Sequence, residues 1–225
     1  MTKAVIFDFD YTLGDSTAGI ARSINYALEK LGHKPRGIPE IRKTVGLSLK
    51  DTFTALTSET ESAEKFAALF REKADEVMTA STVLYPDTVT VLKSLREKDF
   101  KIGIVTTKYR YRIEQILAKF DAEALIDVIV GAEDVKAEKP APEGLLAAIS
   151  HLGADSVLYV GDSLVDAKTA ENAGTDFAAV LMGATPAADF EVRECVCIAE
   201  NLTVLADYVL EKDMSRVRTN PEKSL

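Results

Sequence analysis

Short apolar runs alternate with amphipathic segments along most of the chain. The apolar runs have the length and composition of buried strands, and they fall at residues 4–7, 101–106, 126–130, 156–160, 177–181 and 195–198. The segments between them repeat apolar positions at helical spacing and predict helices over residues 86–98, 110–120, 142–152, 165–173 and 202–210. Because strands and helices alternate, we expect an α/β fold: a doubly wound parallel sheet with helices on both faces.

Residues 16–81 interrupt this alternation because they contain no run typical of a strand. Apolar positions over residues 17–31 follow helical spacing. Residues 35–39 carry the proline and glycine of a turn. Helical spacing returns over residues 49–56 and 63–78. These helices could pack directly on the sheet, but so long a stretch without a strand favours a separate small α-helical domain.

The interruption defines the expected domain organisation. We expect a core domain formed by residues 1–15 and 82–212, with a small helical domain inserted at residues 16–81. The last stretch, residues 213–225, is polar and contains Asn220-Pro221. We expect this tail to be disordered.

The composition is that of an acidic globular protein. The 225 residues are 47% hydrophobic and 28% charged, with a formal net charge of −9. This charge argues against a nucleic-acid surface, because phosphate backbones attract basic patches. No apolar stretch is long enough to span a membrane, and the first residues lead directly into a strand, so we expect neither a membrane segment nor a signal peptide.

Two cysteines, Cys195 and Cys197, lie two positions apart on the last predicted strand. That spacing predicts that both lie on one face of the strand. Since His33 and His151 are remote in sequence, we interpret the pair as buried apolar side chains and not as part of a zinc site. A reduced, cytoplasmic protein fits this cysteine usage. The sequence does not indicate an oligomeric state.

Two carboxylates follow the first predicted strand. Asp8 and Asp10 come directly after the apolar run 4–7 and point the same way, because strand side chains alternate with a period of two. Two like charges at the end of a hydrophobic strand are unfavourable unless something neutralises them. A divalent cation would do so, and carboxylate oxygens suit Mg²⁺. The alternative is a strand that ends in a solvated loop.

Other polar side chains occur at or after the ends of later strands. Thr106 ends one strand, Lys139 precedes a proline that restricts its backbone, and Asp162 and Asp166 follow the strand 156–160. Ligands of open α/β sheets bind at the carboxyl edge, where these residues would gather. Each has a plainer interpretation: a structural threonine, a surface Lys-Pro loop, and a capped helix N-terminus.

Taken in this order, the motifs resemble those of the haloacid dehalogenase-like (HAD) hydrolase superfamily. The resemblance covers nearly the whole chain except the tail. The stretch Asp15–Ala21 and the triplet Thr44-Val45-Gly46 resemble the phosphoglycolate phosphatase-like group within it. The resemblance implies a Rossmann-like core with a small α-helical cap domain at residues 16–81. One departure is Tyr11, where this superfamily commonly has glycine.

The resemblance also implies roles for individual residues. Asp8 would be the nucleophile that forms an aspartyl-phosphate, and Asp10 would protonate the leaving alcohol and then deprotonate the attacking water. Mg²⁺ would be held by the Asp8 carboxylate, the Asp10 carbonyl and Asp162. The remaining candidates are a carboxylate next to the metal ligands and three groups that hold phosphoryl oxygens: Asp166, Thr106, the Thr107 amide and Lys139.

The function implied is that of a Mg²⁺-dependent phosphatase acting on a small phosphomonoester, with a phosphoglycolate-like metabolite as one possibility. Arg42, Lys43 and Lys50 in the helical insertion are candidates to meet a substrate carboxylate or a second phosphate. Alternatively, they form a solvated helix face.

Two other functions are weighed against the phosphatase. A phosphosugar mutase of the β-phosphoglucomutase type usually has a histidine where this chain has Ile20, and an arginine in the loop 45–49, where this chain has none. Both departures disfavour it. A catalytically silent binding protein is disfavoured because all six residues with an implied chemical role are present: Asp8, Asp10, Thr106, Lys139, Asp162 and Asp166.

Overall fold

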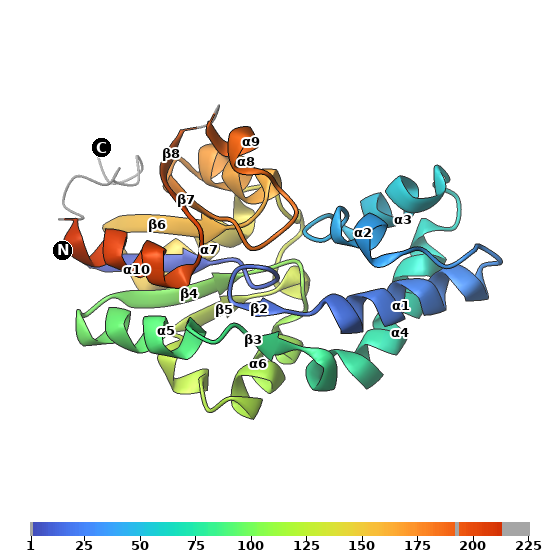
Figure 1. Ribbon diagram of the computed structural model, residues 1–225, viewed down its shortest axis with the longest axis horizontal. Coiled ribbons are helices and arrows are strands. Elements are labelled where there is room, and N and C mark those ends of the chain that lie inside the picture. The colour runs from blue at the N-terminus through green and yellow to red at the C-terminus, as the bar shows by residue number, and fades with distance from the viewer. Residues whose placement is uncertain (1, 192–193, 213–225) are drawn as a thin grey trace.

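The computed structural model describes residues 2–191 and 194–212. Its centre is a six-stranded sheet in the order β5-β4-β1-β6-β7-β8, in which every neighbouring pair is parallel. The strands are β1 (Lys3–Phe7), β4 (Lys101–Val105), β5 (Val128–Val130), β6 (Ser156–Gly161), β7 (Asp176–Val180) and β8 (Cys195–Ala199). The doubly wound parallel sheet predicted from the sequence is therefore confirmed (Figure 1).

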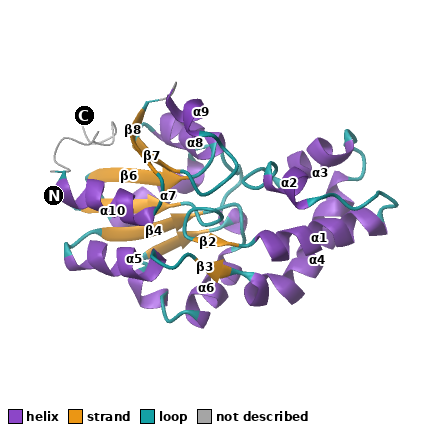
Figure 2. Ribbon diagram, viewed as in Figure 1, coloured by secondary structure: helices purple, strands orange, loops and turns teal. Residues whose placement is uncertain are grey.

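Helices cover both faces of this sheet (Figure 2). On one face, Val5, Phe7 and Leu158 pack against α5 (Thr88–Glu97), α6 (Arg110–Lys119) and α10 (Leu202–Glu211). On the other face, Ile6 and Tyr159 pack against α7 (Glu143–Leu152), α8 (Leu164–Ala173) and α9 (Ala187–Glu191). Short 3₁₀ helices, Glu123–Leu125 and Ala132–Asp134, flank β5. Burial on both faces explains why the strands read as continuous apolar runs.

Four further helices pack around a hydrophobic core of their own. They are α1 (Thr17–Lys30), α2 (Ile38–Arg42), α3 (Leu49–Thr57) and α4 (Ala63–Ser81), and we call them the helical unit. Its core includes Ile24, Leu28, Phe53, Phe66 and Met78, all nearly inaccessible to solvent. Figure 1 shows the helical unit at the carboxyl end of the strands. Separate cores explain why the apolar spacing changes within this stretch.

Two chain crossings connect the helical unit to the sheet, and they pair with each other. β2 (Gly14–Asp15) and β3 (Val83–Leu84) form a short antiparallel ladder. A Cβ atom at Gly14 would lie 2.8 Å from the Val83 carbonyl oxygen, so the close approach requires glycine. The sequence pattern did not predict this ladder, because two-residue strands leave no periodic signal.

The structure corrects three details of the sequence analysis. α2 occupies part of the segment expected to be a turn, and α9 was not predicted. Cys195 and Cys197 do not share a face: a register shift in the β7–β8 pairing places Cys195 against the α7–α9 side and Cys197 against the α10 side. Both cysteines are half-buried. A β-bulge of this kind breaks the period of two from which the shared face was inferred.

The tail expected to be disordered, residues 213–225, lies outside the described residues. Among the helices of residues 2–191 and 194–212, none combines the length and apolar content needed to cross a bilayer.

We expect Phe66→Ala to lower the free energy of unfolding by about 3–5 kcal/mol, because Phe66 is fully buried and its loss leaves a cavity in the helical unit. Urea denaturation measures the change. The control is Leu146→Ala on α7, whose side chain is 37% exposed; this change should cost at most about 1 kcal/mol. Equal losses in the two variants would contradict a separate, well-packed core in the helical unit.

Candidate active site

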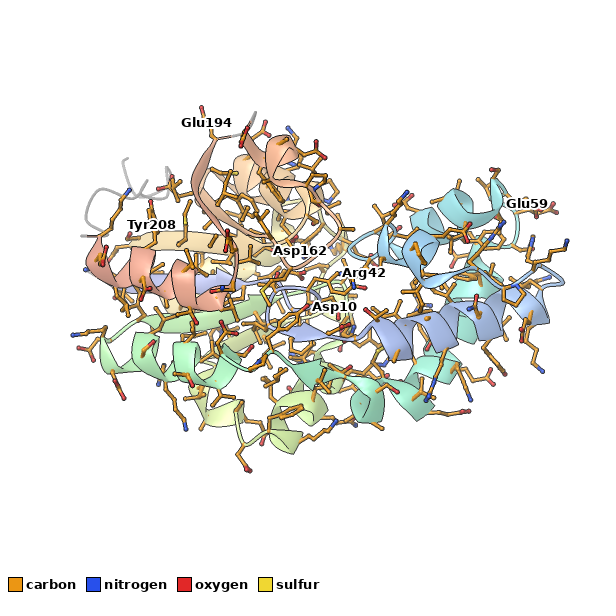
Figure 3. All side chains as sticks on the ribbon, in the orientation of Figure 1. Asp10, Arg42, Glu59, Asp162, Glu194 and Tyr208 are labelled. Atoms are coloured by element: carbon orange, nitrogen blue, oxygen red, sulfur yellow. The ribbon has the colours of Figure 1, made fainter. Side chains whose placement is uncertain are left out.

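The polar residues singled out in the sequence gather at the carboxyl edge of the sheet. Asp8 follows β1, Thr106 follows β4 and Asp162 follows β6, and these three strands are neighbours. All three side chains are more than 90% buried. Figure 3 places Asp10 and Asp162 at the junction of the sheet and the helical unit. The sheet order therefore brings together residues that are up to 154 positions apart.

Three carboxylates form the centre of the site. One oxygen each from Asp8, Asp162 and Asp166 lies within 4.8 Å of the others, and all three residues are buried. Asp166 is held by Ser163, whose amide and hydroxyl both donate to Asp166 Oδ2, at 3.2 and 2.5 Å. This is the capping box that begins α8, so the predicted helix cap and the acidic site use the same residue.

Glycines give these carboxylates their room. A Cβ atom at Gly183, in the loop after β7, would lie 1.7 Å from Asp162 Oδ2. A Cβ atom at Gly161 would lie 2.5 Å from the Asp166 side chain. The two positions accept no larger residue unless the carboxylates move.

Lys139 connects the carboxylates. Its ammonium donates to Asp8 Oδ1 and Asp166 Oδ1, both at 2.7 Å, and to the Tyr159 hydroxyl at 3.2 Å. Tyr159 also lies 3.0 Å from Asp166 Oδ1. Sequence reasoning missed Tyr159, because a tyrosine inside an apolar strand gives no sign of where its hydroxyl points.

One lysine does not neutralise the cluster. Burial raises the pKa of the Asp8 carboxyl to about 7, against the attraction of Lys139. Burial and repulsion from Asp166 and Asp8 raise the pKa of Asp162 well above its ordinary value. Burial alone would lower the pKa of Lys139, but Asp166 and Asp8 outweigh it and raise that pKa. Three buried carboxylates with one ammonium fit a hard divalent cation, which would stabilise their ionised forms.

Asp10 has a different partner. Lys108 donates to Asp10 Oδ2 at 2.5 Å, and both residues are more than 90% buried. Asp10 Oδ1 is buried and, within the described part of the chain, has no hydrogen-bond partner. The Lys108 amide also donates to Thr106 Oγ1 at 3.2 Å, which fixes this loop. Lys108 was not predicted from the sequence, although its position two residues after Thr106 was a usable signal.

Tyr11 adopts a left-handed backbone conformation, with φ = 58°. This conformation is unfavourable for a bulky residue and favours glycine. The Tyr11 side chain is 1% exposed and its hydroxyl lies 2.8 Å from Thr17 Oγ1. Burial and this hydrogen bond offset the strain and fix the start of α1 against the site.

A cleft opens from Asp10 towards the helical unit. Thr107 and Lys108 line it from the sheet, and Thr44, Leu47 and Arg71 line it from the helical unit. Its cavity volume is about 60 Å³, and because one water needs roughly 10–15 Å³ on the same measure, only a small group fits.

The basic residues expected to meet the substrate do not line this cleft. Arg42 and Lys43 border a second depression next to Asp162. The Arg42 guanidinium stacks 4.5 Å from the centre of the Tyr11 ring and donates to the Met182 carbonyl at 3.4 Å. Lys50 is exposed and pairs with Glu64 at 2.6 Å. The structure thus brings Thr107 to the cleft, but not these three cations.

The structure combines an α/β core with an acidic, cation-compatible cluster at the carboxyl edge of the sheet. This is the arrangement that the motifs of the sequence predicted. A family model described as haloacid dehalogenase-like hydrolase matches residues 5–180. The chain belongs to this family, as its motifs indicated.

Individual relatives agree with this assignment. The chain is 36% identical over 180 residues to a phosphoglycolate phosphatase of Cereibacter sphaeroides, covering 77% of this chain and 83% of that protein. It is 32% identical over 181 residues to the pyrophosphatase PpaX of Bacillus velezensis, covering 79% and 82%. A solved structure described as a haloacid dehalogenase-like hydrolase from Bacteroides fragilis has a TM-score of 0.88 and 40% identity, over 91% of this chain and all of that one.

The raised pKa of Asp8 predicts an unusual pH dependence of stability without metal. Because the folded state binds the proton more tightly than the unfolded state, this group's contribution is lost as the pH rises from about 4 to about 7. In EDTA, the free energy of unfolding of the wild type should therefore fall between pH 5 and pH 8, relative to Asp8→Asn. Urea denaturation of both proteins measures the difference.

A divalent cation should reverse this trend, because it favours the ionised carboxylates. Adding millimolar Mg²⁺ at pH 8 should stabilise the wild type and have less effect on Asp8→Asn. A wild type that is equally stable at pH 8 with Mg²⁺ and with EDTA would argue against a cation site here.

Proposed function

We propose that the protein is a Mg²⁺-dependent phosphatase that hydrolyses a small phosphomonoester through an aspartyl-phosphate on Asp8. The observation that carries this proposal is the buried Asp8 carboxylate, oriented by Lys139 and surrounded by Asp162 and Asp166. The phosphatase and the pyrophosphatase named among the relatives support hydrolysis at phosphorus, of an ester in one case and of an anhydride in the other.

The cation would be held by the Asp8 carboxylate, the Asp10 carbonyl and Asp162, with Asp166 beside them. All are oxygen donors, the kind that Mg²⁺ prefers. When bound, the cation would reduce the repulsion between the carboxylate and the phosphoryl group. Lys139, which donates to Asp8 Oδ1 at 2.7 Å, supplies part of the same charge compensation.

The first step joins Asp8 to phosphorus. An oxygen of Asp8 bonds to the phosphorus atom while the bond to the ester oxygen breaks, and Asp10 gives its proton to the departing alkoxide. Thr106 and Lys139 hold the other phosphoryl oxygens, over which charge spreads in the transition state. In this role, the unpaired Oδ1 of Asp10 is the oxygen left to carry that proton.

The second step releases phosphate. Asp10, now ionised, takes a proton from water, whose oxygen attacks phosphorus while the bond to Asp8 breaks. Lys108 holds the other oxygen of Asp10 and keeps the carboxylate directed at the cleft. The helical unit acts as a cap that covers the site and excludes bulk water.

The narrow cleft supports a small leaving group. Phosphoglycolate and pyrophosphate, the substrates after which the relatives are named, both have a short leaving group. A panel of phosphorylated metabolites would identify the substrate of this protein. Release of free phosphate distinguishes this function from a phosphosugar mutase, which would return an isomer of its substrate.

We expect Asp8→Asn to reduce phosphate release by about 10³-fold or more, because the nucleophile is lost. A colorimetric phosphate assay with 4-nitrophenyl phosphate and Mg²⁺ measures this, and circular dichroism checks the fold. The matched control is Asp121→Asn, an exposed aspartate whose positive φ of 54° asparagine also tolerates. Near-wild-type hydrolysis by Asp8→Asn would exclude Asp8 as the nucleophile.

We expect Asp10→Asn to slow both steps but the second one more, because asparagine cannot deprotonate water. With an aryl phosphate, whose leaving group needs little protonation, the aspartyl-phosphate should accumulate. Rapid acid quench and peptide mass spectrometry should find the added phosphate on the peptide that contains Asp8. The absence of any adduct, with turnover unchanged, would contradict the acid–base role of Asp10.

A further inference from the structure

We propose that Arg71, on α4 of the helical unit, is the specificity-determining residue of this enzyme. Its guanidinium binds a second anionic group carried by the leaving group of the substrate, either a carboxylate or a phosphate. The inference rests on the proposed function and deepens it, because it restricts the substrate to phosphate compounds with a short, negatively charged leaving group.

Three cations line the cleft next to Asp10: Lys108, Arg71 and Arg112. Two of them are already paired. Lys108 donates to Asp10 at 2.5 Å. Arg112 donates to Asp75 through Nε at 2.9 Å and through Nη2 at 2.6 Å.

Among the described residues that line the cleft, Arg71 is the cation without a hydrogen-bonded carboxylate partner. Its Nε is buried and, among the described residues, has no hydrogen-bond partner. Its guanidinium lies 5.6 Å from the centre of the Tyr109 ring, which supports the planar group without using its N–H donors. A guanidinium offers several donors in one plane and matches the two oxygens of a carboxylate or phosphate.

Hydrogen bonds from α6 fix the backbone of α4 around Arg71. Arg112 Nη2 donates to the Arg71 carbonyl at 3.1 Å, and the same guanidinium pairs with Asp75 one turn further along α4. Lys119, also on α6, donates to the Thr82 carbonyl just beyond α4, at 3.0 Å. These contacts tie α4 to α6, so Arg71 extends into the cleft from a rigid element.

The other residues that line the cleft favour a short substrate whose second anionic group reaches Arg71. The helical unit otherwise lines the cleft mainly with apolar side chains, such as Ile24, Leu47 and Phe70. Glu138 also borders the cleft; burial raises its pKa, and Arg71 opposes that shift. A substrate anion would compete with Glu138 for the Arg71 guanidinium, whereas a neutral leaving group would gain no charge–charge attraction from it. The small cavity leaves room for only a few heavy atoms beyond the phosphoryl group.

The test compares selectivity among three substrates in the full-length protein with Mg²⁺. They are 2-phosphoglycolate, inorganic pyrophosphate, and 4-nitrophenyl phosphate, which carries no second anion. We expect Arg71→Gln to lower kcat/KM for the preferred anionic substrate on the order of 10- to 100-fold, mainly through KM. The ratio to 4-nitrophenyl phosphate should fall by a similar factor. Whichever of the two anionic substrates loses more identifies carboxylate or phosphate as the bound group.

Two further variants isolate the effect. Arg71→Lys keeps the charge but loses the planar donors, so the selectivity should fall less than in Arg71→Gln. Lys65→Gln removes a cation from an exposed position on the same helix and should leave all three rates unchanged. If Arg71→Gln does not fold, as judged by circular dichroism, the intermediate loss in Arg71→Lys carries the test.

The outcomes separate this inference from the proposed function. Equal losses on all three substrates, or no loss, would overturn the role of Arg71 while leaving the phosphatase intact. A wild type that releases phosphate from none of the three would overturn the proposed function and this inference with it.

Discussion

The contact on which the site depends is the bridge that Lys139 makes between Asp8 and Asp166. Two buried carboxylates at the end of an apolar sheet would each destabilise the fold if they were left ionised and unpaired. One ammonium 2.7 Å from both makes their proximity tolerable, but Asp162 beside them keeps the cluster acidic. The folded protein therefore keeps an excess of negative charge at the position where a cation and a phosphoryl group would act together. Stability and chemistry make opposite demands on these residues.

The order of the strands makes this arrangement possible. After β1 the chain builds β4 and β5 on one side, and then crosses to the other side of β1 to form β6, β7 and β8. Lys139 lies between β5 and α7, on the crossover itself, so it reaches both the β1 and the β6 ends. Open α/β sheets bind ligands where the direction of winding reverses. The lysine is thus placed by topology, and its pairing is completed by the capped start of α8.

The sequence predicted the parts of this structure that depend on local pattern. All six strands of the sheet and the helices on its faces other than α9 follow from apolar spacing, and Asp8 and Asp162 lie together because the ends of β1 and β6 do. What the pattern could not supply are contacts between distant segments. Lys108 and Tyr159 take their importance from partners that only the folded chain brings near. The bulge that separates Cys195 from Cys197 depends on pairing with β7, and the β2–β3 ladder is too short to leave a periodic trace.

The paired crossings at β2 and β3 have a consequence for how such enzymes diversify. Because Gly14 and Leu84 are partners across one ladder, the chain leaves the core and returns to it at adjacent points. The core can therefore fold in the same way whether the stretch between β2 and β3 is long or short. An exchange of that stretch in evolution, or in a designed chimera, would alter what is recognised while leaving the reacting groups where they are.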